Sequence, residues 1–225
     1  MIKILLYHNI LNDPQDPSAV IVDNFKMQMK WIADNGYNVI SLKEALKSLN
    51  NNDAPKKSIV FTFDDGFIDF IETALPVLNK YDFCATVFIV VSEVGGFSSW
   101  QEHNLNRRLM NWKSLKEIIC AGHTIGSHGL HHYDLTKLAQ RDLDKEVVAS
   151  KEIIQEKLGI EVDSFSYPWG ICTRREINRV KKAGYNCAAG VVRHGYNTYR
   201  ANRFLLKRIV IEQKDSLGAF IKKII

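Results

Sequence analysis

Short apolar runs alternate along the chain with longer amphipathic stretches, and this alternation predicts βα units around a parallel sheet. The short runs are rich in β-branched and aromatic residues, whereas the longer stretches repeat their apolar positions with a helical period. We expect strands at Ile4–Tyr7, Asn38–Ile40, Ser58–Phe63, Ala85–Val90, Thr124–Gly126, Ser164–Ser166, Asn186–Ala189 and Arg208–Ile211. We expect helices at Asn24–Asn35, Leu42–Leu49, Phe67–Tyr81, Trp112–Ala121, Leu135–Leu158, Arg174–Ala183 and after Asp215.

Glycines mark the ends of several of these helices, since Gly36, Gly122, Gly159 and Gly184 stand where C-terminal glycine caps are expected. A series of βα repeats in 225 residues leaves two architectures, a closed barrel or an open doubly wound sheet. Both place their sites at the C-terminal ends of the strands. No internal repeat or break in composition marks a second unit, so we expect one domain over residues 1–225.

The composition is that of a globular protein, with 46% hydrophobic and 24% charged residues. The formal charge is +5, but Lys and Arg are spread along the chain instead of forming a basic arm, so nucleic-acid binding is not expected. The cysteines lie far apart without a C-x-x-C pair, which favours reduced thiols over a thiolate metal site or a disulfide framework.

The first residues, MIKILLYHNI, are too short an apolar run for a signal peptide. The longest apolar run, Phe83–Val91, covers less than half of the ~20 residues that a membrane-spanning helix needs. We therefore expect a cytoplasmic enzyme without a membrane span, acting on an intracellular glycan or sugar intermediate.

Two adjacent carboxylates follow the predicted strand Ser58–Phe63. In V-F-T-F-D-D-G-F, Asp64 and Asp65 end the strand and Gly66 turns the chain into a helix. Adjacent side chains at a strand end diverge, so one carboxylate can bind a metal while the other faces a metal-bound water. The same residues also fit a simple turn in which one Asp caps the next helix.

A second cluster, I-G-S-H-G-L-H-H-Y-D-L, places His128 and His132 four residues apart. On one helical turn this spacing points two imidazoles the same way, and Asp65 would supply a third metal ligand. His131 competes with His132, because a spacing of three residues faces the same side. Three protein ligands leave positions for water and substrate; the alternative is a loop of surface histidines.

These two segments resemble the motifs of the polysaccharide deacetylases, also called the NodB-homology or carbohydrate esterase 4 family. T-F-D-D-G is similar to the family's first motif and S-H-x-x-x-H to its second. The resemblance implies a single-domain, distorted (β/α)7-type barrel with Asp64 as catalytic base. It also implies a divalent ion, Zn or alternatively Co or Ni, on Asp65, His128 and His132, and so selects His132 over His131.

The family's third motif is represented by F-S-Y-P-W-G. The resemblance implies a groove wall from Tyr167 and Trp169, with a backbone N–H near Trp169 helping to bind the oxyanion. The family's arginine at this point is replaced by Ser166. Arg208 is a candidate substitute that orients the base, with a surface charge as the alternative.

The family's C-terminal L-x-H motif is absent from its expected place, but L-L-Y-H at the end of the first strand contains it. In a closed barrel the first and last strands are neighbours, so a circular permutation returns His8 to the site. The chain resembles such a permuted branch, similar to poly-N-acetylglucosamine deacetylases. His8 is accordingly the expected general acid and His194 the alternative.

The resemblance thus implies a metal-dependent hydrolase that removes an N-acetyl group from an amino sugar of a glycan and releases acetate. One alternative is a barrel glycosidase with two carboxylates, which would not need the histidines. Others are a metal-binding but catalytically weak carbohydrate-binding domain, or a deacylase of a small acylated amine. The long irregular stretch from Gly95 to Arg108, with Trp100, His103, Arg107 and Arg108, is either an ordered loop or the substrate side of the site.

Overall fold

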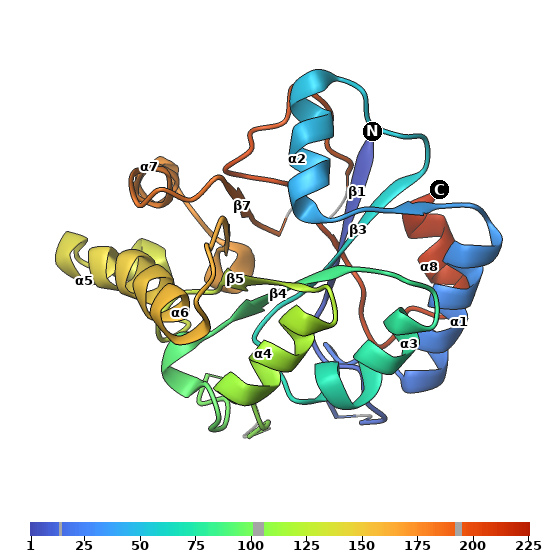
Figure 1. Ribbon diagram of the computed structural model, residues 1–225, viewed down its shortest axis with the longest axis horizontal. Helices are drawn as coiled ribbons and strands as arrows, with labels where there is room; N and C mark the ends of the chain where they lie inside the picture. Colours follow the sequence, from blue (N-terminus) through green and yellow to red (C-terminus); the bar gives the residue numbers. More distant parts are fainter. Residues whose placement is uncertain (14, 101–105, 192–194) are drawn as a thin grey trace.

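A single curled sheet of parallel strands forms the centre of the molecule, surrounded by helices (Figure 1). The computed structural model describes residues 1–13, 15–100, 106–191 and 195–225. Of the eight strands in these residues, seven follow the order β7-β6-β5-β4-β3-β1-β8, and β2 pairs with β3 outside this order. They are β1 Ile2–Tyr7, β2 Asn38–Val39, β3 Ser58–Phe63, β4 Ala85–Ile89, β5 Thr124–Ser127, β6 Ser164–Ser166, β7 Cys187–Ala189 and β8 Ile209–Val210.

The connecting helices lie close to the predicted positions. They are α1 Val22–Asp34, α2 Leu42–Asn51, α3 Leu75–Asn79, α4 Trp112–Cys120, α5 Gln140–Asp144, α6 Ser150–Leu158, α7 Arg174–Lys182 and α8 Leu217–Ile224. Wide π turns precede α3 and α6, namely η1 Phe70–Ala74 and η5 Lys145–Ala149, and short 3-10 turns are η2 Val91–Glu93, η4 Leu135–Lys137 and η6 Pro168–Gly170. None of the helices in the described ranges is long and apolar enough to cross a membrane.

The segment before β8 joins the two ends of the sheet. Leu206 forms a parallel bridge with Ala189 of β7, and three residues later Ile209 pairs with Leu5 of β1. The bridge includes a hydrogen bond from Leu206 N to Ala188 O at 2.9 Å. The sheet is therefore a distorted barrel, as the family resemblance implied, and β1 and β8 are neighbours.

Two hydrophobic clusters lie on opposite faces of the sheet. Ile4, Val60 and Phe88 belong to one, which also takes in residues of α2, while the adjacent Leu5 and Phe61 belong to the larger cluster, which includes residues of the other helices. Because successive side chains of a strand face opposite sides, the first cluster fills the barrel interior. In β3 every second side chain after Val60 also faces inward, namely Thr62 and then Asp64. The Asp64 carboxylate therefore lies at the C-terminal end of the barrel interior.

The predicted helix over residues 135–158 is interrupted near its start. Leu138 and Ala139 have extended backbones, with ψ near +147° and +158°, so the 3-10 turn η4 is separate from α5. From Gln140 the chain runs through α5, η5 and α6 to Gly159, whose φ of +69° gives the expected left-handed C-cap. Hence the prediction of one unbroken helix was wrong only in its first turn and in the π turn.

Candidate active site

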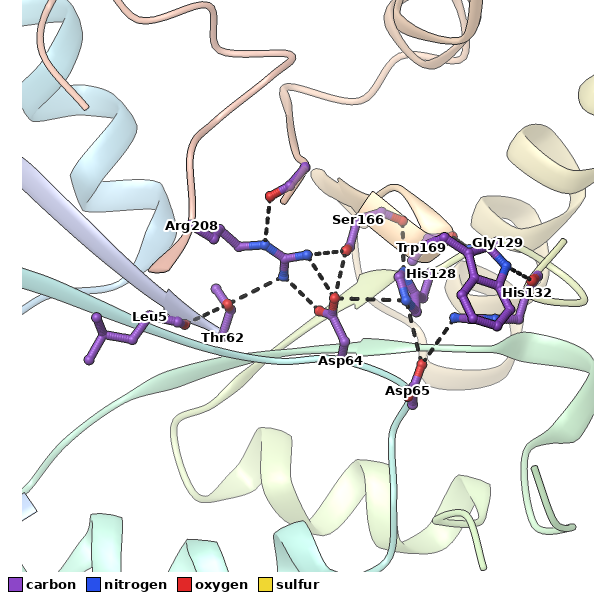
Figure 2. Close-up of polar contacts among 12 residues, drawn as sticks. Leu5, Thr62, Asp64, Asp65, His128, Gly129, His132, Ser166, Trp169 and Arg208 are labelled. Carbon is purple, nitrogen blue, oxygen red and sulfur yellow. Dashed lines mark hydrogen bonds and ion pairs between the residues drawn. The ribbon is translucent and has the colours of Figure 1, made fainter. Parts of the chain in front are cut away.

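Asp64 and Asp65 directly follow β3 at the C-terminal edge of the sheet, and both are buried (Figure 2). Asp65 has φ +74° and Gly66 has φ +82°, so the backbone enters the left-handed region immediately after Asp64. A Cβ at position 66 would lie 3.0 Å from Ile89 Cγ2, so this turn requires glycine. The turn sends the two carboxylates in different directions, Asp64 toward Arg208 and Asp65 toward the histidines (Figure 2).

Arg208 and Ser166 hold the carboxylate of Asp64 from inside the barrel (Figure 2). Arg208 Nη1 and Nη2 donate to the two Asp64 oxygens at 2.7 Å each, and Ser166 Oγ donates to Oδ2 at 3.0 Å. Burial alone raises the pKa of Asp64, but the charge and the hydrogen bonds of Arg208 outweigh it and hold that pKa well below its usual range. Asp64 is therefore an ionised carboxylate. Arg208 is fully buried, so its alternative interpretation as a surface charge is wrong.

Asp65, His128 and His132 converge on one point, and their ligand atoms all lie within 4.8 Å of one another. Asp65 Oδ1 lies 3.3 Å from His132 Nε2 and 3.5 Å from His128 Nε2. Ligands bound tetrahedrally at about 2.0–2.1 Å from a zinc ion are separated by about 3.4 Å. The three residues thus have the spacing of a divalent-metal site.

The hydrogen bonding and charge of these three residues also fit a cation. Asp65 Oδ1 is buried and has no hydrogen-bond partner among the residues that the structure describes. Burial and the neighbouring charge of Asp64 raise the pKa of Asp65 well above its usual value, an effect that a bound cation would offset. His128 Nδ1 donates to Ser166 O at 2.8 Å, which leaves Nε2 as the free lone pair. Burial lowers the pKa of His128 to about 4 and also lowers that of His132, so both imidazoles are neutral, as metal ligands must be.

The two histidine ligands lie on a loop after β5, so the prediction that they share a helical turn was wrong. Gly129 and His132 have φ values of +83° and +60°, which curl the chain back on itself where a helix would have continued. His131 points elsewhere, because its Nδ1 donates to Glu146 Oε1 at 2.6 Å. His128 and His132 are both buried, which excludes the alternative of a loop of surface histidines.

His8 lies beside Asp64 at the mouth of the barrel. Tyr7 pairs with Phe63 in the β1–β3 register, so the next residue of each strand, His8 and Asp64, are neighbours. His8 Nδ1 is buried, and no atom in the described part of the chain forms a hydrogen bond with it. Burial lowers the pKa of His8, and the negative charge of Asp64 opposes that effect. Strand β1 thus brings an imidazole next to Asp64, the expected base; His194, the alternative general acid, lies outside the described residues.

Of the two aromatic side chains Tyr167 and Trp169 in the third motif, only that of Trp169 is exposed to solvent. Trp169 is 47% exposed, its Nε1 donates to His132 O at 3.2 Å, and its ring packs edge-on against that of His132. Tyr167, in contrast, is fully buried, and its hydroxyl donates to Phe204 O at 2.9 Å. The expectation that Tyr167 forms a groove wall was wrong, because its ring packs against Phe165 in the core.

A pocket of about 550 Å³ opens beside His132, one of the three candidate metal ligands. Trp100 lines it and stacks on His132, with ring centroids 4.6 Å apart, so the long irregular stretch does reach the site. The remaining lining residues are Ser99, His131, Tyr133, Asp134, Lys137, Trp169 and Ile171. The length of the loop was the signal for Trp100, whereas no feature of the sequence pointed to Glu146, which binds the histidine loop.

Comparisons with known proteins agree with this geometry. YxkH of Bacillus subtilis (strain 168), assigned to the polysaccharide deacetylases, is 31% identical over 185 residues, which cover 82% of this chain and 62% of YxkH. The poly-β-1,6-N-acetyl-D-glucosamine N-deacetylase of Staphylococcus aureus (strain MRSA252) is 27% identical over 214 residues, covering 91% of this chain and 71% of that enzyme. The chain therefore spans less than two thirds of YxkH.

A solved structure shows the same fold over the whole chain. The Streptococcus pyogenes deacetylase PplD, determined in complex with acetate, superposes with a TM-score of 0.87 at 25% identity, covering 100% of this chain and 98% of PplD. The sequence model of the polysaccharide deacetylases matches residues 51–188, which contain both aspartates, both histidine ligands and the third motif. With this match over more than half of its length, the chain belongs to the polysaccharide deacetylase family.

Proposed function

We propose that this chain is a divalent-metal-dependent hydrolase that removes the N-acetyl group from an amino-sugar residue of a glycan or glycan intermediate. The observation that carries the proposal is that the two adjacent aspartates have different partners. Asp64 is ionised and held by Arg208, while Asp65 faces two neutral imidazoles at metal-binding distances. An open pocket is lined by His132, one of these imidazoles, which would give a substrate access to the site.

Asp64 is the proposed base. A carboxylate offers about four lone-pair positions, and donors from Arg208 and Ser166 occupy three of them, so one remains to accept a proton. Asp64 Oδ2 lies 3.8 Å from Nε2 of the ligand His128, so the carboxylate stands beside the metal position. The fixed fork of Arg208 keeps the free lone pair in one orientation.

Asp65, His128 and His132 would hold the metal ion, and two imidazoles with one carboxylate suit Zn²⁺, with Co²⁺ or Ni²⁺ as alternatives. When bound, such an ion supplies an acidified water and polarises the acyl oxygen. Asp64 would take the proton of the attacking water, and His8 would donate a proton to the departing sugar amine. The exposed ring of Trp169 would pack against the substrate at the pocket wall. The products are acetate and a free amino sugar.

Oligomers of β-1,6-linked N-acetylglucosamine are the proposed substrate class, because the Staphylococcus aureus relative is a deacetylase of that polymer. A small acylated amine is the second candidate, since a volume of about 550 Å³ is ordinary for a small-molecule site. The idea of a catalytically weak sugar-binding domain rested on the missing arginine of the third motif. Arg208 now takes the position beside the base, so that reason no longer applies.

Acetate release from β-1,6- and β-1,4-linked N-acetylglucosamine oligomers tests the proposal, with Zn²⁺, Co²⁺ or Ni²⁺ added and with a chelator. We expect chelation to abolish activity and added metal to restore it. Asp65→Ala should lose metal and activity together, while Asp64→Asn should keep metal and lose ~10²–10⁴-fold in kcat. Activity that resists chelation, or a fully active Asp64→Asn variant, would overturn the proposal.

A further inference from the structure

The loop that carries both histidine ligands has no regular secondary structure, although His128 N donates to Ile89 O at 2.9 Å and Leu130 O accepts from Ser92 N at 2.9 Å. Ser127 is the last residue of β5, and the next regular element, η4, begins at Leu135. Between them the backbone must keep His128 and His132 at a fixed separation, although it makes no helical ladder. The positive φ values of Gly129 and His132 make this segment depend on contacts from elsewhere in the chain.

Glu146, a buried residue, accepts three hydrogen bonds from this loop. Its Oε2 accepts from Leu130 N at 2.8 Å and from His131 N at 2.9 Å, and its Oε1 accepts from His131 Nδ1. The Glu146 side chain is only 3% exposed, and among the described residues its ion-pair partner is His131. One buried carboxylate thus binds two successive backbone N–H groups midway between the two metal ligands.

The close approach of Glu146 also constrains the loop. A Cβ at Gly129 would lie 3.2 Å from Glu146 Oε2, and the φ of +83° there already favours glycine. Glu146 itself lies in η5, the π turn between α5 and α6. Turns of this kind are rare within helices and occur often at functional sites.

We propose that Glu146 is a positioning residue that fixes the separation of His128 and His132 for the metal ion. Glu146 is absent from the cluster of potential metal ligands, and it lies outside the pocket lining. Its effect therefore passes through the backbone of Leu130 and His131. The inference rests on the proposed metal site and adds a residue to it.

Metal affinity of the purified full chain is the appropriate measurement. Apo protein is titrated with Co²⁺ and with Zn²⁺ in competition with a chelator, and the visible absorption spectrum of the Co²⁺ form reports ligand geometry. Glu146→Ala should weaken metal binding ~10–100-fold, the usual effect of removing a residue that orients metal ligands, and should change the spectrum. Glu146→Gln keeps one acceptor oxygen but not the second, so its affinity should lie between those of wild type and Glu146→Ala.

Two further variants separate the parts of the interaction. His131→Ala removes the imidazole but leaves both backbone hydrogen bonds to Glu146, so it should bind metal better than Glu146→Ala. Glu152→Ala, at an exposed site on α6, removes the same charge away from the loop and should leave affinity and spectrum unchanged.

Wild-type affinity and spectrum in Glu146→Ala, with only its thermal stability lowered, would show that Glu146 is merely structural. If Glu146→Ala does not fold, wild-type affinity in Glu146→Gln would overturn the inference in the same way. A wild-type chain that binds neither Co²⁺ nor Zn²⁺ would overturn both this inference and the proposed function. A chain that binds metal with the expected Glu146 dependence but releases no acetate would contradict only the proposed function.

Discussion

Replacing Arg208 by Met is the sharpest test of how the base is held. Arg208 is fully buried and Asp64 is 3% exposed, so the substitution leaves a buried carboxylate with Ser166 as its remaining strong donor. Breaking a buried, hydrogen-bonded ion pair from one side costs about 3–5 kcal/mol, because the other charge stays buried without compensation. Methionine fills much of the same volume, which keeps any cavity small.

The pH dependence of this cost follows from the direction of the Asp64 pKa shift. In the wild type the pKa of Asp64 is depressed, so the pair stabilises the fold above the unfolded pKa of about 3.9 and loses that contribution as the pH falls further. In Arg208→Met, the positive charge that opposed the effect of burial is gone, so the pKa of Asp64 rises. The variant then regains stability when Asp64 takes up a proton, so the difference from wild type should be largest near pH 7 and shrink toward pH 4.

The assays are denaturant unfolding of the apo proteins at several pH values and acetate release by the metal-loaded proteins. We expect kcat to fall by ~10²–10⁴-fold, since a protonated or misoriented Asp64 no longer serves as base. Lys207→Met is the matched control, because it removes the same charge from the adjacent, exposed residue. Arg208→Lys should be intermediate, since an ammonium keeps the charge but not the two-pronged hydrogen bonding. Equal stability and equal kcat in Arg208→Met and Lys207→Met would refute the reasoning.

Three further predictions concern other parts of the molecule. His8→Asn should retain metal but lose ~10²-fold or more in kcat, and an unchanged kcat would transfer the acid role to another group. Trp169→Ala should raise KM for oligomers more than it lowers kcat, as measured by initial rates, because the proposed role of the half-exposed ring is to pack against the substrate and not to contact the reacting bond. Burial raises the pKa of Asp69 to about 6, so the free energy of unfolding should fall by up to about 3 kcal/mol as the pH rises from 4 to 6. Asp69→Asn should flatten that part of the stability curve, and a slope equal to that of wild type would contradict this.

The strands, and the functional residues that follow them, could be predicted because β3 and β4 are buried at every position and form continuous apolar runs in the sequence. Parallel strands in a barrel necessarily bring their C-terminal ends together, so Asp64, His128 and the third motif had to converge. Closure of the barrel was harder to predict, since it depends on the bridge between Ala189 and Leu206 outside the regular strands. Only the family resemblance favoured the barrel over an open sheet.

Loop conformations and long-range partners could not be read from the residues. The four-residue spacing of His128 and His132 fits a helical turn, yet left-handed backbones at two loop positions produce the same convergence without a helix. The tyrosine of the third motif looked like a groove residue, but the direction of its side chain depends on strand register, which turned Tyr167 into the core. Glu146 stands in an amphipathic stretch like many others, and only the fold shows that it faces the histidine loop.

The adjacent aspartates receive opposite electrostatic environments from one strand end, and this difference links the base to the metal. The positive charge of Arg208 keeps Asp64 ionised. Burial and the negative charge of Asp64 disfavour ionisation of Asp65. A buried Asp65 carboxylate therefore requires a second positive charge, and neither neutral imidazole provides it. A divalent ion at this point would restore the balance and would lie beside Asp64, the proposed base. Groups whose surroundings drive their pKa values apart are typical of a base and a ligand in one site, and here one left-handed residue, Asp65, makes that separation possible.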